Sequence, residues 1–117
     1  MDDLKQPALD LQASVEAACE RMNIDALLKR KLELDQESAR PDFWNDPRHA
    51  QDVVQEQAKL ERRTRPWLDL QKDIEDLVEM LDLGDETMRP ELESNLAELT
   101  ERFASLKKEL KFADPYD

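Results

Sequence analysis

Glycine is almost absent from this chain of 117 residues, in which Gly84 is the single one. One glycine excludes the glycine-rich loops that cradle phosphates in nucleotide-binding sites. The sequence also has one cysteine, Cys19, which excludes an internal disulfide and fits a reducing compartment. Because 39% of the residues are charged and little material remains for strands and tight turns, the predicted fold is all-α.

Long apolar runs are missing as well. No stretch of about 18 apolar residues could cross a membrane, and the acidic start Met1-Asp2-Asp3 does not have the pattern of a secretory signal. A cytoplasmic location is therefore expected. The chain has 17 basic and 29 acidic residues, a net charge of −12. Such a charge disfavours contact with phosphate backbones, so no strong autonomous binding of nucleic acid is expected.

Residues that carry chemistry are few. A di-metal carboxylate bundle needs two Glu-x-x-His repeats, but His49 is the single histidine and is expected to be a solvated side chain. The acidic run that starts at Asp82 does not match a calcium-binding EF-hand loop, because its glycine stands at the third position instead of the sixth. We predict no catalytic, cofactor-binding or metal-binding residue, and the chain is not expected to be an enzyme.

Two segments upstream of residue 40 are predicted to be helical. The first is expected to begin near Pro7 and to have an apolar face of Leu9, Leu11, Val15, Ala18 and Met22. Asp25 as an N-cap favours a break at Asn23-Ile24-Asp25 over a continuation of the first helix, which is the alternative. The second segment carries Leu27, Leu28, Leu32 and Leu34 and should end at Ser38-Ala39-Arg40-Pro41, because proline cannot continue a helix.

The run Pro41-Asp42-Phe43-Trp44-Asn45-Asp46-Pro47 interrupts the helical pattern. Asn45 or Asp46 can cap a new helix whose first residue is Pro47. Phe43 and Trp44 are predicted to pin the corner to a neighbouring helix, so that the run is a capped turn with a hydrophobic plug. A docking role for an exposed Trp44 is the alternative.

The longest helix is expected from Pro47 to Gly84, which suits a left-handed C-cap. Its apolar seam steps by three and four through Ala50, Val53, Gln57, Leu60, Thr64, Trp67, Gln71, Ile74, Val78 and Leu81. Pro66 predicts a kink or a short interruption in this helix. A last helix should begin at Pro90, capped by Thr87 or Glu86.

The last helix has the most regular pattern in the sequence, the stripe Leu92, Leu96, Leu99, Phe103, Leu106 and Leu110. This stripe should pack antiparallel against the preceding helix, forming a coiled-coil-like hairpin of 47–83 with 90–111. The predicted architecture is an elongated antiparallel bundle of three to four helices in a single domain, 1–117.

Four cations, Lys59, Arg62, Arg63 and Arg65, lie close together within the longest helix of this acidic chain. Alternating charges that keep an exposed helix soluble are the simplest interpretation. The functional alternative is a docking patch, either for an acidic partner or for a limited contact with ribosomal RNA, which a few phosphate contacts could support.

The turn and its surroundings resemble the N-terminal domain of bacterial peptide chain release factor 2, a class I release factor. The likeness is specific at Asp42-Phe43-Trp44-Asn45-Asp46-Pro47, continues through Arg48-His49-Ala50-Gln51, and extends from about Ile24 to the final Tyr116-Asp117. It is weaker over the first twenty residues. The Trp-containing turn favours factor 2 over release factor 1, which shares the helical domain.

The resemblance implies a role in translation termination. Full-length members of this family read the stop codons UGA and UAA and trigger peptide release with a Ser-Pro-Phe-type element and a Gly-Gly-Gln loop in later domains. Here no serine precedes a proline and a single glycine cannot supply Gly-Gly-Gln, so this chain alone is not expected to terminate translation. The implied partners are the GTPase-associated region of the large ribosomal subunit, ribosomal protein L11 and release factor 3.

Two other functions are compatible with the sequence. A stand-alone helical interaction or oligomerisation module could share the turn, in which case the stripe of 92–110 would drive self-association. A chain with only the docking domain could also act as a decoy that competes with the intact release factor.

Overall fold

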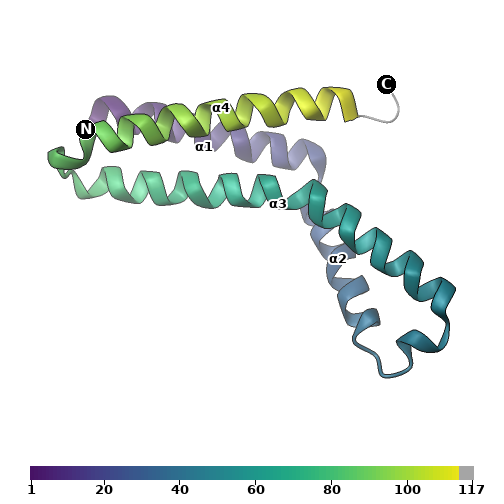
Figure 1. Ribbon diagram of the computed structural model, residues 1–117. Helices are drawn as coiled ribbons and strands as arrows, with labels where there is room; N and C mark the ends of the chain where they lie inside the picture. The colour runs from purple at the N-terminus through teal and green to yellow at the C-terminus, as the bar shows by residue number, and fades with distance from the viewer. Residues whose placement is uncertain (114–117) are drawn as a thin grey trace. The chain divides into compact units, whose positions relative to one another are not determined.

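The structure, a computed structural model, describes residues 1–113 of the chain. Its elements are four α-helices and two short 3₁₀ turns (Figure 1): α1 (Asp2–Met22), α2 (Ile24–Ser38), η1 (Phe43–Asn45), α3 (Pro47–Leu83), η2 (Glu86–Met88) and α4 (Arg89–Ala113). All regular structure over residues 1–113 is helical, so the prediction of an all-α fold is confirmed. Over the same residues, no helix combines the length and the apolar character needed to span a bilayer.

The chain divides into two compact units, and the division falls within α1 and within α3. The bundle unit comprises Met1–Ala18 and Trp67–Asp117, and the hairpin unit comprises Cys19–Pro66. The division assigns the later part of α3 to the bundle unit and its first part to the hairpin unit. The α-helical backbone continues through Pro66, so the predicted interruption does not occur, whereas the kink stays a prediction.

In the bundle unit, α1, the later part of α3 and α4 lie side by side (Figure 1). The Trp67 ring on α3 meets Phe103 on α4 edge to face, with 6.1 Å between ring centroids. Arg102 Nη1 donates a hydrogen bond to Asp73 Oδ2 at 2.8 Å. On the other side, Lys5 of α1 pairs with Asp82 of α3 at 2.5 Å. The contacts of Trp67 with Phe103 and of Asp73 with Arg102 confirm the predicted packing of the stripe helix against α3.

The stripe on α4 is used inside the bundle unit. Leu92, Leu99 and Phe103 are buried, and the remaining members are partly buried: Leu96, Leu106 and Leu110. Self-association through this stripe is therefore disfavoured, because its apolar surface is already covered. Leu70 and Leu77 on α3 are also buried, although they lie outside the predicted seam. Contacts with two neighbours, α1 and α4, require a wider apolar face than a two-helix seam provides.

Two predicted helix starts are wrong by a few residues. α1 begins at Asp2 and contains Pro7, because a proline so near the start removes only one backbone hydrogen bond and the acidic first turn of Asp2 and Asp3 favours the N-terminus. The break before α2 is confirmed, but its N-cap residue is Asn23 rather than Asp25. Asn23 adopts a left-handed φ of 56°, a conformation that asparagine tolerates better than most residues.

The connection between α3 and α4 begins as predicted and then differs. α3 ends at Leu83, and Gly84 follows with a φ of 69°, the left-handed C-cap. The cap of the next turn is Asp85, whose Oδ1 accepts hydrogen bonds from the backbone N–H and the hydroxyl of Thr87. Neither Thr87 nor Glu86 caps α4, which begins at Arg89, one residue before Pro90. α4 continues to Ala113 rather than Lys111, and Tyr116-Asp117 lies outside the described residues.

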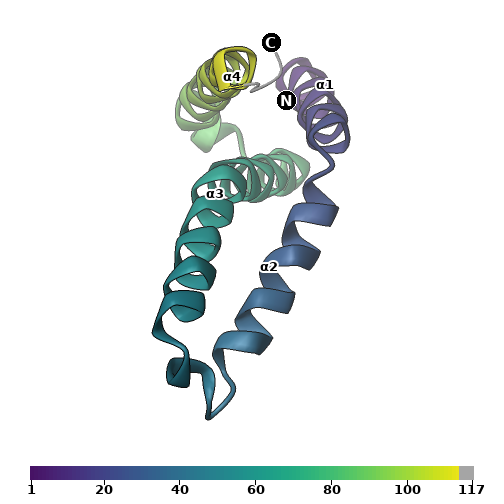
Figure 2. The same ribbon diagram turned by 90° about the vertical axis from the view of Figure 1, so that its right-hand side faces the viewer.

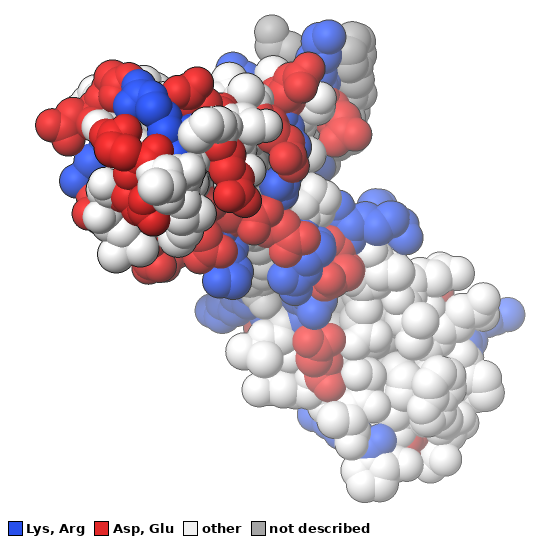
Figure 3. Space-filling view, turned by 60° about the vertical axis from the view of Figure 1, so that its left-hand side comes forward, with Lys and Arg blue, Asp and Glu red and all other residues white. Residues whose placement is uncertain are grey.

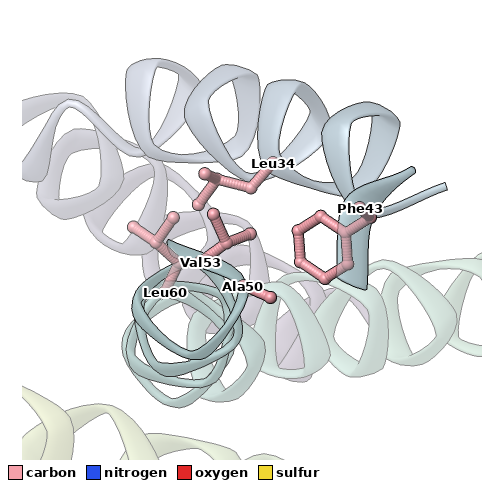
Figure 4. Packing of buried hydrophobic residues seen from close by; sticks show 5 residues of the cluster. All are labelled: Leu34, Phe43, Ala50, Val53 and Leu60. Atoms are coloured by element: carbon pink, nitrogen blue, oxygen red, sulfur yellow. The ribbon is translucent and has the colours of Figure 1, made fainter. Parts of the chain in front are cut away.

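The hairpin unit pairs α2 with the first part of α3 in antiparallel orientation, joined by the turn at η1 (Figure 2). Its core is one apolar cluster (Figure 4), against which Leu27 packs: Leu34, Phe43, Ala50, Val53 and Leu60. Leu32, which the sequence placed among the apolar positions of α2, is 57% exposed. With a single partner helix, α2 needs only a narrow apolar face, and Leu32 falls outside it.

Candidate functional site

The predicted basic patch lies in the hairpin unit, on the first part of α3. Lys59, Arg62, Arg63 and Arg65 are all exposed. At about 100° of rotation per residue, Arg62 lies on the side of the helix away from Leu60, which packs toward α2, whereas Lys59 and Arg63 lie on one flank, about 100° and about 60° from Leu60. The patch is thus a solvent-facing surface of α3.

Two carboxylates near this patch on the same helix, those of Glu56 and Glu61, have partners on α2, whereas the exposed Asp52 forms no ion pair within residues 1–113. Arg30 of α2 donates two hydrogen bonds to Glu56, Nε to Oε2 at 2.8 Å and Nη2 to Oε1 at 3.0 Å. Lys31 of α2 lies 3.4 Å from Glu61 Oε2. The hydrogen bond from Arg30 lowers the pKa of Glu56. α2 therefore supplies cations to the acidic residues that would otherwise neutralise α3.

One member of the predicted patch is itself paired. Arg65 Nε donates to Glu61 Oε1 at 2.9 Å, and this hydrogen bond, together with the weaker contact of Lys31, lowers the pKa of Glu61. Lys59, Arg62 and Arg63 form no ion pair within residues 1–113. These three residues are called the cation face below.

The two units carry very different charge. The hairpin unit has ten basic and ten acidic residues, whereas the bundle unit has seven basic and nineteen acidic ones. The whole net charge of −12 therefore belongs to the bundle unit, over which carboxylates are dense in Figure 3. The hairpin unit shows few acidic groups on its face in the same view. An anionic partner would be repelled by the bundle unit and tolerated by the hairpin unit.

The two aromatic residues of the turn differ in burial. Phe43 is 6% exposed and belongs to the core of the hairpin unit, as predicted. Trp44 is 67% exposed, so its predicted role as a buried plug is wrong. Its ring meets Phe43 edge to face, with a centroid distance of 5.0 Å. In a 3₁₀ turn, successive residues are rotated by about 120°, so neighbouring side chains cannot both point into the same core.

The start of α3 follows the predicted capping pattern. Asp46 accepts hydrogen bonds from two backbone N–H groups, that of His49 at its Oδ1 at 3.2 Å and that of Ala50 at its carbonyl oxygen at 2.9 Å. Pro47 is the first residue of α3. Asn45 ends η1 and is not the cap. The turn is consequently held by Phe43 in the core and by Asp46 at the helix end, while Trp44 remains accessible.

His49 is exposed but not isolated. Its Nε2 lies 2.6 Å from Oε1 of Glu37, which joins the first turn of α3 to the end of α2. The hydrogen bond and the negative charge of Glu37 raise the pKa of His49. Within the described part of the chain, no three His, Cys, Asp or Glu side chains are grouped so as to hold a metal ion.

The grooves described in the bundle unit are small. One of about 240 Å³ lies between α3 and α4 beside Asp73 and Arg102, and one of about 250 Å³ lies between α1 and α3 beside Val15 and Ile74. Both volumes fall below the usual range of small-molecule sites, about 300–1,000 Å³. The surface of the hairpin unit is thus the stronger candidate site, and it suits a macromolecular partner.

The sequence alone identifies the residues of the cation face but not the reason that they form no ion pairs. That reason is the pairing of Arg30 and Lys31 with Glu56 and Glu61 across two helices. The register of a helical hairpin fixes such pairs, and the hydrophobic pattern alone gives the register only to within a turn. The exposure of Trp44 was likewise not predicted.

Comparison with known proteins gives a consistent result. A model of the PCRF domain matches residues 27–117. Peptide chain release factor 2 of Saccharopolyspora erythraea is 32% identical over 109 residues, which cover 93% of this chain and 29% of that protein. The same factor of Paramagnetospirillum magneticum is 29% identical over 92% of this chain and 30% of its own length.

A third relative extends the similarity to the full length of the chain. Peptide chain release factor 2 of Chloroflexus aggregans is 25% identical, with 100% of this chain and 31% of that protein covered. The chain thus spans about a third of the length of the curated relatives that it matches.

Proposed function

Because this chain belongs to the PCRF domain family, we propose that it is a non-catalytic domain of a peptide chain release factor and that it serves translation termination by docking on the ribosome. The observation that supports a docking role is the division of charge. One unit carries the whole excess of carboxylates, and the other is neutral with an unpaired cation face. Ribosomes are polyanions, so the neutral unit is the one that can approach them.

The docking position follows from the resemblance of the turn at Trp44 to release factor 2. We place the domain near the GTPase-associated region of the large subunit in the cytoplasm, close to ribosomal protein L11. At that position it can influence the action of release factor 3. Lys59, Arg62 and Arg63 are the proposed contacts with phosphates of ribosomal RNA, and Arg65 contributes less because Glu61 already pairs with it.

An in vitro peptide-release assay tests this function. Ribosomes programmed with a stop codon and peptidyl-tRNA receive an intact release factor 2 and an excess of this chain. If the chain occupies the docking position, release by the intact factor slows as the chain is added, because the two compete. An unchanged release rate at saturating chain would contradict the proposal.

A charge variant makes the assay specific. Arg62→Glu reverses one member of the cation face, whereas Lys108→Glu makes the same change at an exposed position of α4 in the bundle unit. The first variant should compete poorly and the second as well as the unaltered chain. Equal loss in both would indicate an effect of total charge rather than of a defined surface.

A further inference from the structure

We propose that the exposed indole of Trp44 stacks on an unpaired base of an RNA strand whose phosphates lie along the cation face. This inference rests on the proposed function and adds a second kind of contact to it. The first observation is the exposure of Trp44, 67% of a large aromatic side chain. Tryptophan is mostly buried in folded proteins, and here the neighbouring Phe43 already fills the core of the turn.

The position of the ring is well defined. Phe43 is fixed in the apolar cluster, and its ring holds that of Trp44 edge to face at an interplanar angle of 81°. Asp46 and Pro47 fix the following backbone by starting α3. A flat ring that is held in place and open to solvent is a suitable stacking surface, because little conformational freedom is lost when a base covers it.

Cations of the hairpin unit lie on both sides of Trp44 in the sequence. Arg40 precedes the turn and Arg48 lies in the first turn of α3; both are exposed and form no ion pair within residues 1–113. At a rise of about 1.5 Å per residue, Lys59 lies about 18 Å along α3 from Pro47. Arg62 and Arg63 extend the positive surface by one further turn. An RNA strand of a few nucleotides could reach from the turn to the cation face.

The charges at the turn itself favour a base over a phosphate there. Asp42 and Asp46 lie close to Trp44 in sequence, and the Asp46 carboxylate is fixed at the helix N-terminus by the His49 N–H. Near these carboxylates a phosphate would be repelled, whereas the face of a base is uncharged and stacks on an aromatic ring. The two contacts are therefore of different kinds. A base stacks on Trp44 at the turn, and Lys59, Arg62 and Arg63 on the helix neutralise phosphates.

Tryptophan fluorescence tests the stacking directly, because the second tryptophan is buried. Trp67 is 3% exposed in the bundle unit, and the variant Trp67→Phe leaves Trp44 as the single emitter. Titration at low salt with a short oligoadenylate should quench Trp44. Inorganic polyphosphate, a polyanion without bases, should bind the cation face without quenching. Equal quenching by the two probes would overturn the proposal.

Affinity measurements with labelled oligoadenylate avoid any dependence on the Trp67 variant. Trp44→Ala should weaken binding about tenfold, since stacking on one base is worth roughly 1–3 kcal/mol, and should leave the salt dependence unchanged. Arg62→Ala should instead lower the slope of log K against log salt by about one. If Trp44→Ala binds as tightly as the unaltered chain, the stacking role is refuted.

The outcomes also separate this inference from the proposed function. If the chain competes in peptide release while Trp44→Ala binds RNA normally, the docking function stands and the stacking role fails. If Trp44 emission changes only with ribosomal proteins freed of RNA, the ring fits a protein pocket and the proposal is overturned. If the chain does not slow peptide release at all, the proposed docking function is refuted, and the stacking role that rests on it is refuted as well.

Discussion

Arg30 on α2 holds the carboxylate of Glu56 on α3 through two hydrogen bonds, of 2.8 and 3.0 Å. The two residues are 26 positions apart in sequence, and the positive charge of Lys59, one turn beyond Glu56 on α3, acts on the same carboxylate more weakly than Arg30 does. A contact between two helices of the hairpin thus offsets a negative charge that lies beside Lys59 on α3.

Loss of this pair should have a small effect on stability that depends on salt. Arg30→Ala should lower the melting temperature slightly in dilute buffer, and the difference should disappear at high salt, because the pair is exposed and screened. Lys29→Ala is the matched control, since Lys29 is exposed and has no ion pair within residues 1–113. A salt-independent loss would mean that Arg30 acts mainly through packing of its side-chain stem.

The two aromatic residues of the turn should differ sharply in their contribution to stability. Phe43→Ala removes a buried ring from the core of the hairpin unit and should cost about 3–5 kcal/mol. Trp44→Ala should cost less than about 1 kcal/mol, because two thirds of the side chain is already in solvent. Chemical denaturation of both variants measures the difference, and similar losses would show that Trp44 packs in solution.

The single histidine makes the stability of the hairpin unit depend on pH. Glu37 raises the pKa of His49 in the folded chain, with smaller contributions from Asp46 and Asp52. Because the folded value exceeds the unfolded value of about 6.5, the stabilisation is fully present below pH 6.5 and is lost as the pH rises through the folded pKa.

Comparison with His49→Gln checks this sign. The melting temperature of the unaltered chain should exceed that of the variant at pH 6 by more than at pH 8. In NMR titration the only histidine resonance should report a raised pKa, and Glu37→Gln should return it toward its ordinary value. A pKa of His49 that does not respond to Glu37→Gln would contradict the observed hydrogen bond.

Gly84 offers a prediction about backbone conformation alone. Its φ is +69°, and a Cβ atom added there would meet nothing within 4 Å. Gly84→Ala should therefore destabilise the chain by about 1 kcal/mol through the left-handed backbone, with no clash against residues elsewhere in the chain. Gly84→Asn, which tolerates this conformation better, should cost less. Equal losses in thermal denaturation would imply that the conformation of the turn is not the cause.

Much of the fold could be predicted from local signals. Proline at 41 and 47 and the glycine at 84 mark helix ends directly, and the stripe from Leu92 to Leu110 identifies a packed helix. Each of these features affects residues only a few positions away, so it can be recognised in the sequence. The specific part of the family resemblance is also a short run, Asp42-Phe43-Trp44-Asn45-Asp46-Pro47.

Properties that depend on distant neighbours were not predictable in the same way. Leu70 and Leu77 are buried because α3 has two partners in the bundle unit, a fact that the pattern of α3 does not contain. Pro7 lies inside α1, near the place where Asp3 contacts Arg89 of α4. The sequence predicted a buried Trp44 because aromatic residues are usually buried. In the structure, Phe43 already fills the core of the turn.

Docking through the hairpin unit is tested most directly by the affinity of this chain for ribosomes, measured by sedimentation with Arg62→Glu and Lys108→Glu as a matched pair. We expect Arg62→Glu, which reverses a charge on the cation face, to weaken binding at least about tenfold, and Lys108→Glu, on the acidic bundle unit, to leave it unchanged. Equal affinities for the two variants would contradict docking through the hairpin unit.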